Sequence, residues 1–136
     1  MSDGAHNLTG VWHGQYLYPV PVEPVHFLAT VIDSGGHLTG MTQETAGLGG
    51  QPVDKAATLS GTKDGTSVSF LKTYTPASEA FQDVVYVGTL NAEGDEIEGA
   101  WIVPDPDGEE TWAGTFLMIR KRTPARAETR ETEATL

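Results

Sequence analysis

The feature of this 136-residue chain that most limits its fold is short apolar alternation, interrupted at close intervals by turn sequences. Apolar residues alternate with polar ones instead of recurring at the spacing of an amphipathic helix. Glycine and Asx clusters divide the alternation at 33–36 (DSGG), 63–65 (KDG), 91–96 (NAEGDE) and 105–108 (DPDG). Such clusters supply the positive φ angles and Asx turns that join antiparallel strands. The chain is therefore predicted to be all-β.

Eight strands follow from the positions of these turns. They are expected at 10–18, 25–32, 37–45, 55–62, 66–74, 83–90, 96–103 and 111–121, with short loops except around 46–54 and 75–82. A regular succession of short strands favours an eight-stranded up-and-down antiparallel β-barrel, because closure leaves no free edge. A flattened sandwich is the alternative. One helical turn is predicted within 76–84, PASEAFQDV.

The length predicts a single barrel domain over residues 1–122. Residues 123–136 are predicted to form a disordered tail, because they contain no aromatic residue and one large aliphatic residue, Leu136. The chain has no cysteine, which excludes disulfides, a thiol nucleophile and a thiolate metal site. The N-terminal sequence MSDGAHNLTG lacks the basic and apolar regions of a secretory signal. No apolar stretch approaches the ~20 residues of a membrane helix. We therefore expect a cytoplasmic protein without membrane association.

The formal net charge of −11 argues against nucleic acid as a partner, since an acidic protein repels the phosphate backbone. Three tryptophans stand close to glycines, in GVWHG (10–14), GAWIV (99–103) and TWAGTF (111–116). Glycine weakens a strand locally but permits the coiling that a small barrel requires, and a large neighbouring ring can fill the space. Trp12 is accordingly predicted to plug one end of the barrel.

Several segments, in their order along the chain, resemble the avidin and streptavidin family of the calycins. They are LTGVW (8–12), GGHLTGM (35–41), ATLSGT (57–62), SVSFLKTY (67–74), VVYVGTL (84–90) with IEGAWIV (97–103), and GTF (114–116). Gly10 and Trp12 near the start, with Arg120 or Arg122 near the end, resemble the calycin pattern in which an arginine stacks across the early tryptophan. The resemblance covers most of residues 8–119 and implies the same barrel.

The residues with which that family binds biotin do not carry over. The family's ureido-binding asparagine and serine correspond to Gly14 and Tyr18, its tyrosine and a second serine to Thr42 and Glu44, and its strand-eight aspartate to Gly114. Each buried polar group left without a partner costs ~1–3 kcal/mol. We therefore expect an avidin-like barrel whose ligand is not biotin.

Strand alternation and the resemblance together predict which residues face the mouth of the barrel. The predicted ligand-binding residues are Tyr16, Tyr18, Thr42, Glu44, Phe70, Tyr86, Trp101 and Trp112. An aromatic cup with one carboxylate suits a small, flat, apolar ligand, or a cation held by Glu44 and the ring faces. The alternative is that the rings simply fill an interior only wide enough for side chains.

No sequence motif of an enzyme is present, and we predict no catalytic residue, cofactor or metal site. His13 and His26 lie on neighbouring predicted strands but are expected at the surface. DPDGEE (105–110) departs from a calcium-binding loop at Pro106 and lacks the third ligand, so a hairpin turn is expected. The alternative function is a barrel enzyme of the isomerase or cyclase type that uses Glu44 or His26 inside the cup.

The residues expected on the outside of the later strands are unusually apolar for a barrel exposed to water. They are Leu71, Val85, Val87, Ile102, Leu117 and Ile119, joined by Leu17 on the first strand. The outer faces of the fifth to eighth strands are therefore predicted to form a homo-oligomer interface, in a dimer or tetramer. The resemblance implies the same interface.

Overall fold

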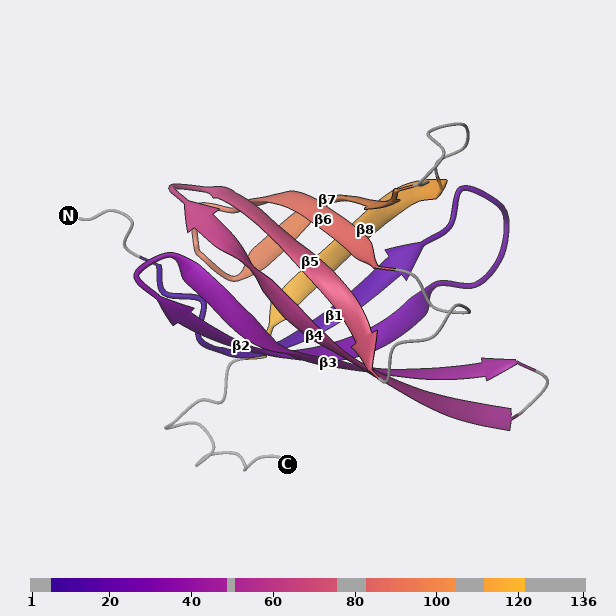
Figure 1. Cartoon of the computed structure of the whole chain (residues 1–136). Helices are drawn as coiled ribbons and strands as arrows, with labels where there is room; N and C mark the ends of the chain where they lie inside the picture. Colours follow the sequence, from indigo (N-terminus) through magenta and orange to yellow (C-terminus); the bar gives the residue numbers. More distant parts are fainter. Residues whose placement is uncertain (1–5, 49–50, 76–82, 105–111, 122–136) are drawn as a thin grey trace, which may run out of the picture.

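The computed structural model describes residues 6–48, 51–75, 83–104 and 112–121, and over 45–48 and 51–54 it describes the backbone only. Eight strands form one sheet, and β8 pairs with β1 to close the barrel (Figure 1). The strands are β1 (Gly10–Leu17), β2 (Val25–Ser34), β3 (His37–Leu48), β4 (Gln51–Asp64), β5 (Ser67–Thr75), β6 (Val84–Leu90), β7 (Glu96–Val103) and β8 (Trp112–Arg120). Each strand is antiparallel to its neighbours in sequence, which confirms the predicted up-and-down barrel and excludes the sandwich.

The hairpin of β3 and β4 is longer than predicted. The loop expected around 46–54 is wrong, because the two strands remain paired from Thr45 with Asp54 to Leu48 with Gln51. In Figure 1 this part of the hairpin projects beyond the body of the barrel. The glycines and proline of AGLGGQPV (46–53) have a weak strand preference, which continuous antiparallel pairing outweighs.

Three of the four predicted turns are confirmed by positive φ at Gly35 and Gly36, Gly65, and Gly94. The turn predicted at 105–108 and the tail predicted at 123–136 lie outside the described residues. The helical turn predicted within 76–84 falls mainly outside them, and Val84 begins β6. In the described ranges there is no helix with the length and apolar character needed to cross a bilayer.

Alternation along the strands separates the barrel interior from its surface. In β5 the even-numbered residues from Val68 to Tyr74 are buried, and their odd-numbered neighbours are exposed or half-buried. β2 shows the same period, with Phe27, Ala29 and Val31 buried. Among the residues whose side chains are described, the core contains nineteen buried apolar residues, drawn from all eight strands and from Leu8.

One end of the barrel is closed by Trp12, as the sequence predicts. The Trp12 side chain is 0% exposed, and its indole N–H donates to the Leu8 carbonyl at 2.9 Å. The guanidinium of Arg120 lies 4.8 Å from the centre of the Trp12 ring, so Arg120 takes the stacking position. The side chains around Trp12 leave a space of only about 10 Å³. This end is a packed core.

Two inward-facing glycines explain how the large rings fit inside. A Cβ atom on Gly14 would lie 2.1 Å from the Phe27 ring, and a Cβ on Gly114 would lie 2.6 Å from the Trp101 indole nitrogen. Each ring therefore occupies the space that a side chain on the adjacent strand would need. These two glycines therefore indicate packing against an aromatic ring on the neighbouring strand.

Candidate functional site

The other end of the barrel contains a cavity of about 300 Å³. Its wall is formed by Tyr16, Tyr18, Lys55, Lys72, Tyr74, Val84, Tyr86, Trp101, Val103 and Trp112. Five of the eight residues predicted to bind a ligand lie in this wall: Tyr16, Tyr18, Tyr86, Trp101 and Trp112. We call this cavity the cup. The two sequence interpretations, filled core and open cup, thus describe opposite ends of one barrel.

Aromatic rings of the cup pack edge to face around Trp101. The Trp101 ring centre lies 5.4 Å from that of Tyr18 and 5.9 Å from that of Tyr16. The Trp101 indole N–H donates to the Leu17 carbonyl at 2.9 Å, which fixes the ring on the wall. Trp112 lies at the rim with 53% of its surface exposed, and its ring centre is 6.5 Å from that of Tyr18.

The other three predicted residues do not line the cup. Phe70 stacks on Tyr86 with ring centres 4.8 Å apart and belongs to the packed layer beneath the cup. Thr42 is buried, and its hydroxyl has no hydrogen-bond partner among the described residues. Glu44 is 0% exposed and is not part of the lining. All three are inside the barrel, as strand alternation together with the family resemblance predicts, but they do not line the cup.

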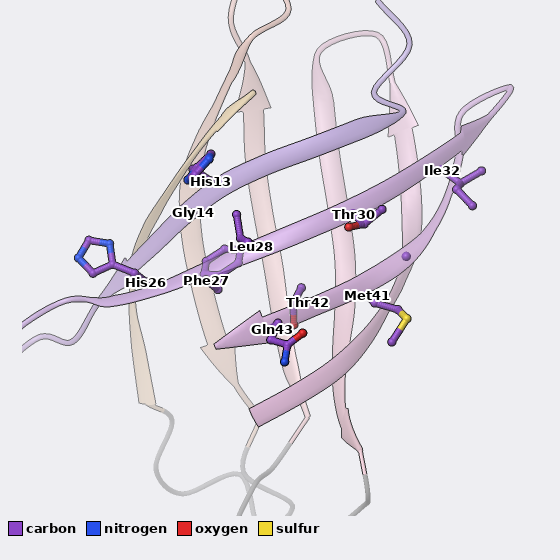
Figure 2. A pocket seen from close by; sticks show the side chains of 11 residues that line it. His13, Gly14, His26, Phe27, Leu28, Thr30, Ile32, Met41, Thr42 and Gln43 are labelled. Atoms are coloured by element: carbon purple, nitrogen blue, oxygen red, sulfur yellow. The ribbon is translucent and has the colours of Figure 1, made fainter. Parts of the chain in front are cut away.

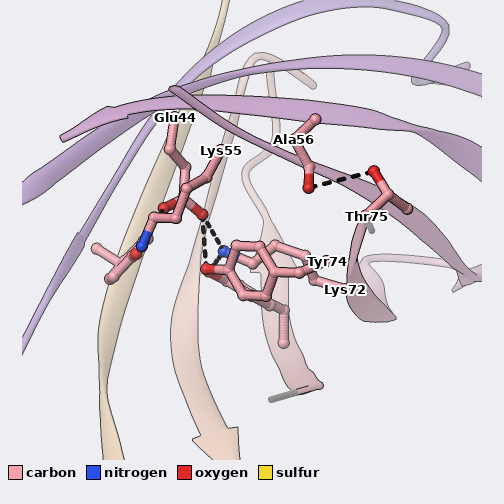
Figure 3. Close-up of polar contacts among 8 residues, drawn as sticks. Glu44, Lys55, Ala56, Lys72, Tyr74 and Thr75 are labelled. Carbon is pink, nitrogen blue, oxygen red and sulfur yellow. Dashed lines mark hydrogen bonds and ion pairs between the residues drawn. The ribbon is translucent and has the colours of Figure 1, made fainter. Parts of the chain in front are cut away.

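Glu44 is the centre of a buried polar cluster formed by β1, β3, β4 and β5 (Figure 3). Its Oε2 atom accepts from Lys72 Nζ at 2.6 Å and from the Tyr74 hydroxyl at 2.8 Å. Its Oε1 atom accepts from the Tyr16 hydroxyl at 2.9 Å and lies 3.7 Å from Lys55 Nζ. Each carboxylate oxygen therefore accepts a hydrogen bond from a tyrosine hydroxyl and has a lysine ammonium nearby.

Burial and charge oppose one another in this cluster. Burial by itself would raise the pKa of Glu44, but the Lys72 ammonium and the tyrosine hydroxyls hold that pKa below its ordinary value. Burial lowers the pKa of Lys72, and the Glu44 carboxylate only partly offsets this. Burial, followed by the nearby Glu44 charge, raises the pKa of the Tyr16 and Tyr74 hydroxyls well above the ordinary range.

The Lys72 ammonium is surrounded by aromatic rings. Its Nζ atom lies 4.6 Å from the ring centre of Tyr74, 4.7 Å from Tyr16 and 5.4 Å from Tyr86. These distances are within the range of cation–π contacts. The rings and the carboxylate that were expected to hold a cationic ligand thus already hold a cation of the chain itself. A second cation placed there would meet the Lys72 ammonium.

Sequence analysis missed Lys72, Tyr74 and Lys55. The signal for the first two was present, because they follow Phe70 at intervals of two on β5 and share its inward face. A lysine is rarely buried without a partner, so its position on this face does not by itself predict burial. The partner, Glu44, lies 28 residues away in the sequence.

A second hollow, of about 790 Å³, lies on the outside of β1–β3 (Figure 2). Exposed side chains of His13, His26, Leu28, Ile32 and Met41 border it. The two histidines are at the surface as predicted, and an enzyme role for His26 inside the cup is therefore wrong. The described residues contain no group of three side chains suited to a metal ion.

Comparison with protein-family models and with curated proteins finds no match to this chain. The structural evidence on function is therefore the barrel itself and the geometry of the cup. An eight-stranded antiparallel up-and-down barrel is the general architecture of the calycins, and it is a scaffold compatible with ligand binding.

Proposed function

We propose that this protein binds a small, flat, largely apolar ligand in the cup. The observation that carries the proposal is the difference between the two ends of the barrel. The end around Trp12 is filled to about 10 Å³, whereas the cup leaves about 300 Å³ among aromatic side chains. A barrel that served only as a scaffold would gain stability by filling both ends, because unfilled interior space costs packing energy.

The size and lining of the cup support a ligand of one or two fused rings. Ligand pockets range from about 300 to 1,000 Å³, so this cavity is at the small end. The faces and edges of Trp101, Tyr18 and Tyr16 offer stacked and edge-to-face contacts to an aromatic ring. Trp112, exposed at the rim, gives such a ligand further apolar area to cover.

Binding can be tested by calorimetric titration with naphthamide, a neutral two-ring probe. Val103→Trp should weaken binding roughly tenfold or more, because Val103 lines the cup and a larger ring there would occupy the space. Thr58→Trp is the matched control, since Thr58 is exposed on the outer face of β4, between the buried residues Ala57 and Leu59, and does not line the cup. Failure of the parent protein to bind the probe would refute the proposal. Equal affinity in parent and Val103→Trp would show that the probe binds elsewhere.

We further propose that the barrel is avidin-like but does not bind biotin. The stacking of Arg120 on Trp12 supports the likeness. The space at Gly14 is taken by Phe27, the space at Gly114 is taken by Trp101, and Glu44 is engaged by Lys72 and two tyrosines. A ureido group would find few free partners there. Calorimetry should detect no tight binding of biotin, and nanomolar affinity would contradict this proposal.

A further inference from the structure

We propose that the cup selects aromatic ligands that carry a carbonyl or carboxylate oxygen, and that this oxygen enters first and accepts a hydrogen bond from Lys72. The inference rests on the proposed function and specifies the chemical class of its ligand. It depends on three features: the unused donor capacity of Lys72, the position of Glu44 behind the wall, and the second lysine at the cup.

Lys72 reaches the cavity although almost none of its surface is open to solvent. The residue is 1% exposed, yet its side chain forms part of the cup wall. An ammonium group has three N–H donors. Among the described residues, two acceptors occupy them: Glu44 Oε2 at 2.6 Å and the Tyr86 hydroxyl at 3.2 Å. The third N–H has no hydrogen-bond acceptor among the described residues, and it belongs to a buried lysine that lines an unfilled space.

The negative partner of Lys72 is inaccessible to a ligand. Glu44 is 0% exposed and lies behind the wall, with both oxygens engaged. Lys55 adds a second ammonium to the wall, with a side chain 21% exposed and its Nζ 3.7 Å from Glu44 Oε1. Among the described residues, the charged groups that line the cup are therefore positive. An oxygen acceptor is matched to them, and a cation is opposed.

The expected selectivity is large enough to measure. A hydrogen bond to a charged group is worth roughly tenfold or more in affinity. The chain as a whole carries a charge of −11 and repels anions at long range. Mobile ions screen this repulsion beyond about 8 Å at physiological ionic strength. A neutral amide and a carboxylate on the same ring should thus both bind more tightly than an ammonium on that ring.

The test uses three probes with one ring system: naphthoate, naphthamide and naphthylmethylammonium. In calorimetric titrations at physiological ionic strength, naphthoate and naphthamide should each bind at least roughly tenfold more tightly than naphthylmethylammonium. Equal affinity for all three would overturn the inference while leaving the proposed function standing. Absence of binding by all three would instead refute the proposed function.

The assignment to Lys72 is tested by the double variant Lys72→Met with Glu44→Gln. Both charges are removed together, since removing one alone would leave the other buried without its partner. In this variant the affinity ratio of the oxygen-bearing probes to the ammonium probe should fall to roughly threefold or less, because the charged donor is gone. Lys63→Gln, which removes a lysine near the β4–β5 turn at the opposite end, is the matched control and should keep the full preference. Retention of the preference in the folded double variant would overturn the assignment.

A second measurement on the parent protein does not depend on the folding of a variant. The sequence contains four lysines, Lys55, Lys63, Lys72 and Lys121, so the NMR signals of their labelled side-chain nitrogens are few enough to assign. Naphthoate and naphthamide should shift the Lys72 signal, and Lys63 should be unaffected. A Lys72 signal that stays unchanged when both probes are saturating would overturn the inference.

Discussion

Two tryptophans that have similar neighbours in the sequence have different surroundings in the barrel. Trp12 is enclosed by core residues at the packed end, whereas Trp101 forms part of the cup wall. Trp12→Ala should lower the free energy of unfolding by ~3–5 kcal/mol, the range for emptying a large aromatic site. Trp101→Ala should cost less, because water and neighbouring rings can enter the space it leaves. Urea unfolding of both variants and of the parent protein shows which substitution lowers the free energy of unfolding more.

The same two variants distinguish a cup from a filled interior. Trp101→Ala should also weaken the binding of naphthamide, and Trp12→Ala should affect it little as long as the protein stays folded. Equal stability losses in the two variants, with no change in naphthamide binding, would contradict the difference between the two ends.

Three buried tyrosines predict how stability depends on alkaline pH. Burial raises the pKa values of Tyr16, Tyr74 and Tyr86 above the ordinary value. The folded protein therefore retains protons that the unfolded chain releases above about pH 10, so their stabilising contribution is lost as pH rises. Above about pH 10, each of the three tyrosine hydroxyls should lower the free energy of unfolding by about 1.4 kcal/mol per pH unit.

Urea unfolding measured at a series of alkaline pH values should show this slope. Tyr74→Phe should reduce the slope by roughly one group's share, or about 1.4 kcal/mol per pH unit. The phenolate absorbance of these three tyrosines, recorded in parallel, should appear only as the barrel unfolds. The expectation fails if the three tyrosines ionise while the barrel is intact, or if Tyr74→Phe leaves the slope unchanged.

At the scale of the strands, glycines allow neighbouring strands and rings to approach closely. Gly114 on β8 pairs with Trp101 on β7, and a Cβ there would lie 2.0 Å from the Leu17 carbonyl oxygen on β1. The backbone cannot yield as a flexible side chain can. That oxygen also accepts the Trp101 indole N–H, so the strand contact and the cup wall depend on one position.

Gly114→Ala should therefore destabilise the barrel by ~1–3 kcal/mol, the usual cost of overpacking. It should also weaken naphthamide binding, because Trp101 would have to shift. Ala113→Val is a suitable control, since Ala113 is the preceding residue on β8 and is exposed. Thermal or urea unfolding of the two variants gives the comparison. A Gly114→Ala protein as stable as the parent would show that β1 and β8 can separate at little cost.

At the scale of the whole molecule, the outer surface carries two apolar regions. On β5–β8 the exposed residues are Leu71, Val87 and Ile119, with Val85, Ile102 and Leu117 half-buried. On β2 and β3 they are Leu28, Ile32 and Met41, which border the outer hollow and were not singled out in the sequence. All seven residues that were predicted to face outside, including Leu17, point outward, in agreement with the alternation along the strands.

We propose that β5–β8 form the interface of a dimer or tetramer. Light scattering at tens of micromolar, roughly the range of a weak complex, should give a mass above that of the monomer. Val87→Lys with Leu117→Glu should reduce the mass to that of a folded monomer. Ile32→Lys with Met41→Glu is the matched pair on the other apolar region and should leave the mass unchanged. A monomeric parent, or dissociation caused only by the second pair, would contradict the proposed interface.

The number of strands and the inward residues could be predicted from the sequence, because both depend on local rules. Strand period decides which face a residue occupies, and glycine and Asx clusters mark the turns. Strand period predicts Trp12 and Tyr16 inside the barrel, and period with the family resemblance predicts Tyr86 and Trp101 there; all four are buried. The β3–β4 extension was missed because pairing between strands outweighed local loop signals.

The cup itself required the tertiary structure. The two-residue period of a strand predicts which face a residue occupies. It does not predict the depth of that residue along the barrel, which depends on the register of every strand around the closed sheet. Phe70 and Trp101 both face inward, yet only Trp101 lines the cavity. Lys72 is stable on the inward face of β5 because Glu44 on β3 and the Tyr86 hydroxyl on β6 accept its hydrogen bonds there. Local sequence determined the barrel, and contacts between distant strands decided which end is open and what charge a ligand meets.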